Sequence, residues 1–192
     1  KFAVAYRVGR DKAFSEIDVE QLVSEVADMK DETLKSLDHY LELFTRRAEE
    51  AGVVVHYAKD AEETNRIINE IGTRAGCRKV VKTKSMTAEE THLSHSMVDE
   101  GFEVTETDLG EWIIQLRDEP PSHMVMPAIH LSRYHVRDLF SEVTGKQEDE
   151  EIEKLVKVAR RQMRRKFVEG EMGITGANFG VAETGSIGIV TN

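Results

Sequence analysis

The sequence has a single cysteine, Cys77, among 192 residues. One thiol can form neither an internal disulfide nor a cysteine-based metal site, and its isolation favours a reducing compartment. The sequence also lacks an apolar run approaching the roughly 20 residues that span a bilayer, and residues 1–10 lack the apolar block of a signal peptide. We therefore expect a cytoplasmic protein without a membrane span and without a metal ion.

Basic residues are outnumbered, with 26 lysines and arginines against 36 acidic residues and a net charge of −10. An acidic surface has no general attraction for nucleic acid or for an anionic membrane. The sequence therefore predicts no nucleic-acid partner, and an anionic ligand would need a local basic site.

The first part of the chain has the pattern of an amphipathic helix. From Val19 to Glu50 apolar residues recur at spacings of three and four, which predicts one long helix, or two helices with a break near Asp31. Gly52 suits the left-handed position that ends such a helix. We interpret residues 1–50 as a helical extension that packs at the edge of a domain.

From residue 51 onward, short apolar runs alternate with amphipathic segments. The runs predict strands at 53–57, 79–83, 102–107 and 123–127. The segments predict helices at 61–75, 87–100, 133–143 and 149–169, while 112–116 fits either a short helix or a buried strand. Such alternation is typical of an α/β domain with a mainly parallel sheet between helices, a three-layer α/β/α arrangement, here over residues 51–192.

The first candidate site follows the predicted strand at 79–83. Lys82 and Lys84 have the same parity and would point to one side, and Ser85 precedes a helix that Thr87 and Glu90 would begin as a capping box. Ligands of open α/β sheets bind outside the carboxyl ends of the strands, and a helix N-terminus favours an anion. The three residues thus predict a site for a carboxylate or phosphate; the alternative is two surface lysines on a loop.

The second candidate is the glycine-rich segment from Gly173 to the end of the chain. It predicts a hairpin with strands at 179–182 and 187–191 and with Gly185 supplying the positive φ of the turn. Glu183 could be a nucleophile, a general base or a partner for a cation, and further polar groups could contact a ligand there: Asn178, Thr184 and Ser186. The alternative is that the glycines serve only the hairpin.

Histidines are the third candidate. His123 and His130 bracket the predicted strand at 123–127, so they either lie beside a site at the strand ends or are ordinary half-buried histidines. His92 and His95 lack the H-E-x-x-H pattern of a zinc site and fit a solvated helix face.

Four motifs in this order resemble one known family. They are V-V-K-T-K-S-M at 80–86, E-T-D-L-G-E-W-I-I-Q-L at 106–116, E-P-P-S-H with P-A-I-H within 119–130, and G-I-T-G-A-N with A-E-T-G-S within 173–186. Together they are similar to the LUD domain of the lactate-utilisation protein B family, over nearly the whole chain.

The resemblance implies the fold of CoA transferases and ribose-phosphate isomerases. It also implies a longer protein, truncated here before a ferredoxin-like segment whose cysteines hold two four-iron clusters. None of those cysteines is present, so this part would carry no cofactor itself. The whole protein would be an electron-transfer subunit that works with other subunits of a complex to oxidise L-lactate to pyruvate.

Three functions remain open from the sequence. In the first, the domain binds a small anion at Lys82, Lys84 and Ser85 together with Asn178, Glu183, Thr184 and Gly185. In the second, it is a non-catalytic scaffold that docks the partner subunits. In the third, by analogy with CoA transferases of the implied fold, Glu183 makes it a transferase; fold alone does not establish that activity.

Overall fold

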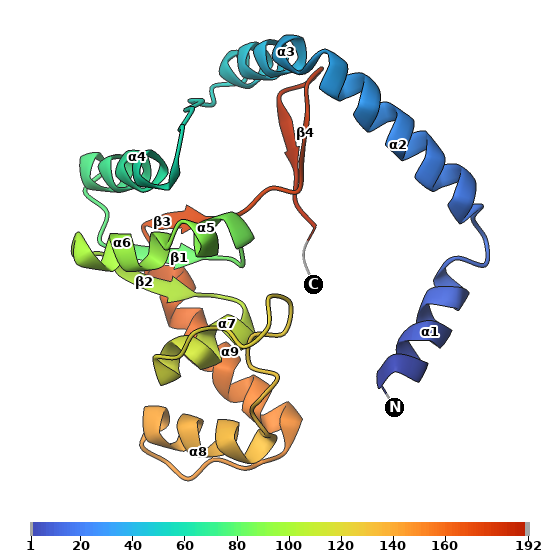
Figure 1. Cartoon of the computed structure of the whole chain (residues 1–192). Helices are drawn as coiled ribbons and strands as arrows, with labels where there is room; N and C mark the ends of the chain where they lie inside the picture. Colours follow the sequence, from blue (N-terminus) through green and yellow to red (C-terminus); the bar gives the residue numbers. More distant parts are fainter. Residues whose placement is uncertain (1, 191–192) are drawn as a thin grey trace. The chain divides into compact units, whose positions relative to one another are not determined.

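The computed structural model describes residues 2–190, which form two compact units (Figure 1). The helical unit comprises the chain up to Val55 together with Phe179–Gly188, and the α/β unit comprises His56–Asn178 with Ile189 and Val190. The first division lies close to the predicted end of the helical extension. The hairpin belongs to the helical unit, which the sequence pattern did not indicate.

The helical unit contains α1 (Phe2–Ala13), α2 (Val19–Lys35) and α3 (Leu37–Glu50). The long predicted helix is thus two helices, and the break falls at Ser36, whose φ of −130° is not helical. Gly52 has the predicted left-handed conformation, with φ of 87°. No residue of α2 is buried, so the apolar stripe along this helix is exposed.

The predicted hairpin is confirmed as β4 (Phe179–Val181) paired antiparallel with β5 (Ser186–Gly188). Gly185 has φ of 68° in the turn. A Cβ atom on Gly185 would lie 2.3 Å from the backbone nitrogen of Ala48. Only glycine therefore allows this turn to pack against α3.

The α/β unit is built on a parallel sheet with the strand order β2-β1-β3. These strands are β1 (Lys79–Lys82), β2 (Glu103–Glu106) and β3 (Met172–Ile174). The sheet lies among helices, which confirms the α/β prediction. β3 was not predicted, because three residues with a central glycine carry too little β-branched character to be recognised alone.

The face of β1 that contains Val80 packs against α4 (Ala61–Arg74), α5 (Met86–Glu90) and α6 (Leu93–Asp99) through a buried apolar cluster that includes Leu93, Met97 and Phe102. The predicted helix at 87–100 is wrong as one element, because His92 adopts a left-handed φ of 52° between α5 and α6. The predicted cap is also displaced: Ser85, not Thr87, begins α5, and its Oγ accepts from the Ala88 N–H.

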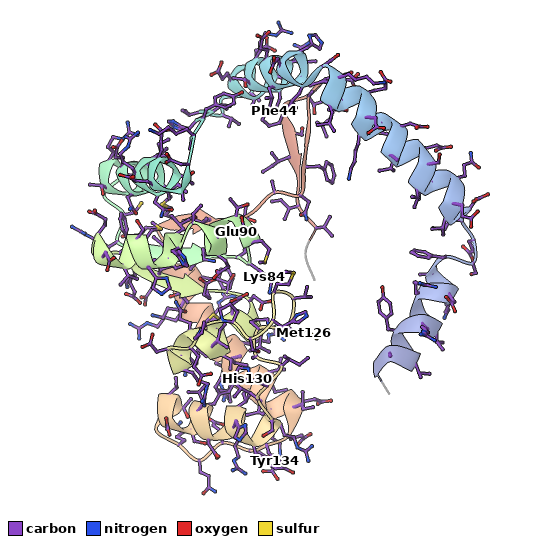
Figure 2. All side chains as sticks on the ribbon, viewed as in Figure 1. Phe44, Lys84, Glu90, Met126, His130 and Tyr134 are labelled. Carbon is purple, nitrogen blue, oxygen red and sulfur yellow. The ribbon has the colours of Figure 1, made fainter. Side chains whose placement is uncertain are left out.

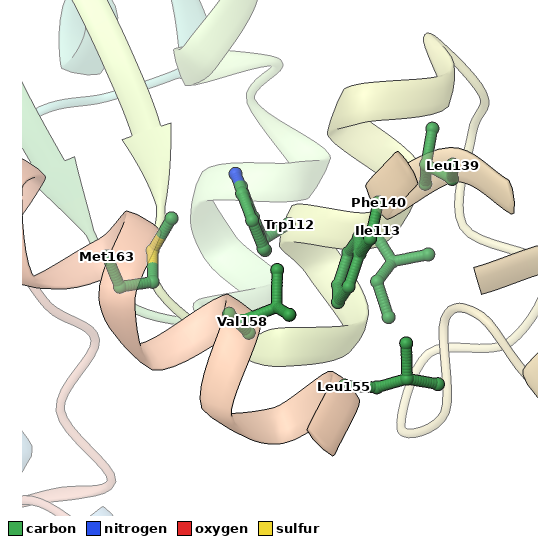
Figure 3. Close-up of a cluster of buried hydrophobic side chains, with 8 residues drawn as sticks. Trp112, Ile113, Leu139, Phe140, Leu155, Val158 and Met163 are labelled. Carbon is green, nitrogen blue, oxygen red and sulfur yellow. The ribbon is translucent and has the colours of Figure 1, made fainter. Parts of the chain in front are cut away.

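A second cluster joins α7 (Leu109–Arg117), α8 (Arg133–Thr144) and α9 (Ile152–Glu169). Figure 3 shows Trp112 and Phe140 at its centre, with ring centroids 5.3 Å apart. The ambiguous segment 112–116 is therefore helical. The side-chain amide of Gln115 accepts from the Glu106 N–H and donates to the Val104 carbonyl. Helix α7 thereby provides hydrogen-bond partners for two backbone groups at the free edge of β2.

Two predicted strands are wrong. Residues 53–57 are irregular, and Val54 is 75% exposed. The β-branched residues of this segment favour a strand only where another strand is available for pairing. Residues 123–127 form a bend, because His123 Nδ1 accepts hydrogen bonds from the N–H groups of Val125 and Met126. A side chain that binds its own backbone in this way competes with strand pairing.

Candidate functional site

A pocket of about 760 Å³ lies at the carboxyl ends of all three parallel strands. Its wall includes Thr83 after β1, Thr107 after β2 and Thr175 after β3, and Ile68, Leu93 and Ile174 add apolar surface. Small-molecule sites commonly have volumes of roughly 300–1,000 Å³, and open α/β sheets bind ligands at this edge. The predicted position of the site is therefore occupied by a pocket of suitable size.

The segment after β1 contributes Lys84 and Ser85 to the pocket. A Cβ atom on Gly176 would lie 3.1 Å from Ser85 Oγ, so this glycine allows the loop after β3 to approach the start of α5. Thr83 Oγ1 and Thr175 Oγ1 are 3.0 Å apart and link the same two loops. Asn178 also lines the pocket, and its Oδ1 accepts from the Val190 N–H at 2.8 Å.

Lys84 is held by the segment that follows β2. Its Nζ lies 3.0 Å from Glu111 Oε1, and the Glu111 side chain is only 5% exposed. Asp108, which lines the pocket, caps α7 by accepting from the N–H groups of Gly110 and Glu111. The capped turn thereby fixes the carboxylate of Glu111, which positions Lys84.

The structure does not place Lys82 beside Lys84 in the pocket. Lys82 is fully buried, it does not line the pocket, and its Nζ pairs with Glu106 at 3.0 Å and with Glu89 at 3.1 Å. Burial raises the pKa of the Glu106 carboxyl, against the opposing effect of Lys82. A ligand cannot reach this ammonium, because it is buried and pairs with two carboxylates. The role of Lys82 in this structure is to join β1 to β2.

The two predicted histidines lie in the loop between α7 and α8, outside the pocket lining. His130 contacts Ser122 Oγ at 2.8 Å and Glu119 at 3.1 Å. Hydrogen bonds from Arg117 and His130 lower the pKa of Glu119 to about 2. The loop reaches the start of α7 through Pro127, whose Cγ would be 2.9 Å from a Cβ on Gly110.

Glu183, Thr184, Gly185 and Ser186 belong to the hairpin of the helical unit. Thr184 Oγ1 donates to Ser186 Oγ at 3.0 Å, an interaction within the turn. None of the four is among the residues that line the pocket of the α/β unit. Of the predicted site residues, the structure therefore brings together Lys84, Ser85 and Asn178.

Asp108, which lines the pocket, and Glu111, which pairs with Lys84, were not predicted from the sequence. Their signal is an aspartate followed three residues later by glutamate at the start of a helix, the pattern of a helix N-terminus. It was hidden because residues 112–116 fitted a strand equally well.

Within residues 2–190 no group of three or more histidine, cysteine, aspartate or glutamate side chains could hold a metal ion. In the same range no helix is long and apolar enough to cross a membrane.

The fold and the pocket define an open-sheet α/β domain with a pocket at the carboxyl edge of its sheet. The family model of the LUD domain matches residues 41–192. The chain therefore belongs to the LUD-domain family.

Curated relatives have the name lactate utilization protein B. The protein of Oceanobacillus iheyensis is 41% identical over 191 residues, which cover 97% of this chain and 39% of that relative. The proteins of Bacillus thuringiensis and Bacillus cereus are each 40% identical over 165 residues, covering 86% of this chain and 35% of the relative. The chain thus spans less than half the length of these relatives. No solved structure matches it.

Proposed function

We propose that this chain is the LUD part of a lactate-utilisation protein and that its pocket binds a small hydroxy- or oxo-carboxylate such as L-lactate or pyruvate. The name of the relatives, lactate utilization protein B, supports a role in lactate utilisation. The observation that carries the proposal is a pocket at the carboxyl ends of three parallel strands with a lysine in its wall. The ammonium of Lys84 would contact the acid group, threonine hydroxyls would contact the ligand's oxygen, and Ile68 and Ile174 would cover its methyl group.

The resemblance to the lactate-utilisation B family extends the proposal to the whole protein, which would transfer electrons through two four-iron clusters and work with other subunits of a complex. The described residues do not fit such a cluster. A four-iron cluster takes four cysteines, whereas this chain has one, and Cys77 is buried. The clusters would therefore be bound outside this part of the protein.

Calorimetric titration of the purified chain with L-lactate, pyruvate, phosphate and coenzyme A tests the pocket. We expect L-lactate or pyruvate to bind and Lys84→Ala to abolish the binding. Lys79→Ala is the matched control, because Lys79 lies at the opposite end of β1 and also forms an ion pair, with Glu169. Loss of binding in both variants, or in neither, would contradict the assignment of Lys84.

A second candidate, a docking scaffold for the partner subunits, is favoured by α2. This helix carries an apolar stripe that includes Leu22, Val26 and Met29, and none of its residues is buried. Sedimentation of the full-length protein with its purified partner subunits tests it. Met29→Asp should weaken the complex and Lys30→Asp, on the same helix, should not; equal complexes with both variants would exclude α2 as the docking surface.

A further inference from the structure

Lys84 is the one cationic side chain among the described residues that line the pocket. Its side chain is 22% exposed, and one of its N–H donors is engaged by Glu111. A lysine ammonium has three donors, so two remain for a ligand. An acid group that enters the pocket therefore meets a lysine whose charge is already balanced.

Glu111 is a fixed negative charge. It lies in the first turn of α7, where the helix dipole stabilises a carboxylate, and its backbone N–H donates to Asp108 Oδ1 at 3.1 Å. Its side chain is almost fully buried, and buried charges are screened far less than exposed ones. Glu111 cannot swing into solvent without breaking this packing.

One ammonium, that of Lys84, and one carboxylate, that of Asp108, line the pocket. The carboxylate of Glu111 is outside the lining but pairs directly with Lys84. A carboxylate ligand is attracted by Lys84 and repelled by Glu111 and Asp108. An uncharged ligand of the same shape is subject to none of these interactions between net charges. The two carboxylates therefore reduce the net attraction that Lys84 exerts on an anionic ligand.

We propose that Glu111 sets the charge preference of the pocket by balancing Lys84, so that it weakens the binding of a small monocarboxylate relative to the uncharged amide of the same molecule. The inference rests on the proposed function in one respect, namely that the pocket is a ligand site. It adds the residue that decides how strongly a charged ligand is held.

Glu111→Gln tests the proposal with little change of shape, because the amide oxygen still accepts from Lys84. Wild type, Glu111→Gln and Glu90→Gln are titrated with L-lactate and with L-lactamide. Glu90 is an exposed acid of α5 and provides the matched control (Figure 2). We expect Glu111→Gln to bind L-lactate on the order of tenfold more tightly and L-lactamide as before, with no change in Glu90→Gln. Unchanged L-lactate affinity, or an equal gain for both ligands, would overturn the proposal.

A second measurement needs no ligand and separates this inference from the proposed function. Brief treatment with acetic anhydride followed by mass spectrometry reports how fast Lys84 is acetylated, and the reaction requires that Nζ be released from its contact with Glu111. Should no variant bind either ligand, the proposed function fails and the labelling decides. Faster acetylation of Lys84 in Glu111→Gln than in wild type and Glu90→Gln supports the balancing role, with Lys79 as internal reference; equal rates refute it.

Discussion

Lys82 and Glu106 are register partners on adjacent parallel strands, and their charged groups meet at 3.0 Å. Lys82 has no exposed side-chain surface, and a second carboxylate, that of Glu89, lies 3.1 Å from its ammonium. The pair stands at the carboxyl ends of β1 and β2, one residue before Thr83 and Thr107 of the pocket wall. A buried ion pair therefore fixes the alignment of two of the three strands whose ends form the pocket.

Replacing Lys82 by methionine should lower the free energy of unfolding of the α/β unit by about 3–5 kcal/mol, because Glu106 is left buried without its partner. Urea unfolding followed by the fluorescence of Trp112, the protein's one tryptophan, measures the loss. Lys79→Met on the same strand should change the free energy by no more than about 1 kcal/mol, because its ion pair with Glu169 is partly exposed. Equal effects at both positions would show that the buried pair contributes no more to stability than the partly exposed pair of Lys79.

Acid should destabilise the protein partly through Glu169. Hydrogen bonds from Lys79 and Arg165 lower its pKa to about 2, from an ordinary value of 4.5. A carboxyl whose folded pKa is depressed contributes stability that is present above the unfolded pKa and is lost as the pH falls through the folded pKa. The urea midpoint of the wild type should therefore fall between pH 5 and pH 2, and by less in Glu169→Gln. Glu153→Gln, on the same helix, should retain the full decrease; an unchanged decrease in Glu169→Gln would contradict the prediction.

Gly72 in α4 should not tolerate alanine. A Cβ atom there would lie 2.8 Å from Cε1 of the buried Phe102 ring, and overpacking a core costs about 1–3 kcal/mol. Thermal unfolding measured by circular dichroism should show a lower midpoint. In α1, Gly9→Ala meets nothing within 4 Å and should instead gain up to about 1 kcal/mol of helix stability. A stabilising effect at both glycines would mean that the ring moves aside freely.

Removal of the α7 cap should weaken both the helix and the pocket wall. Asp108→Ala loses the acceptor for the N–H groups of Gly110 and Glu111, which we expect to cost about 1 kcal/mol. Asp108→Asn keeps an acceptor and should cost a few tenths of that amount. Trp112, which lies four residues into α7, reports the difference in urea unfolding. If the asparagine variant is as unstable as the alanine variant, charge and not capping is the important property.

Three residues of the pocket were predicted from the sequence. Lys84, Ser85 and Asn178 were recognised because they follow or border segments with clear strand or glycine-turn patterns, and strand ends of parallel sheets converge at one edge. Asp108 and Glu111 were missed because the helix they begin is short and apolar on most sides, so its period was ambiguous. The place of the Glu183 turn could not be predicted, because it depends on a contact between Gly185 and Ala48, far apart along the chain.

The sequence by itself determined the α/β alternation, the hairpin with its left-handed Gly185 and the left-handed Gly52 after α3. Hydrophobic period and positive φ are local properties of a few neighbouring residues. Tertiary structure alone decided that Lys82 is buried and Lys84 faces the pocket, although the two lysines are two residues apart. Their environments differ because Lys82 pairs with Glu106 on the adjacent strand, whereas Lys84 lies beyond the last paired residue of β1. Which distant segment covers a side chain is not encoded in the period of its own strand.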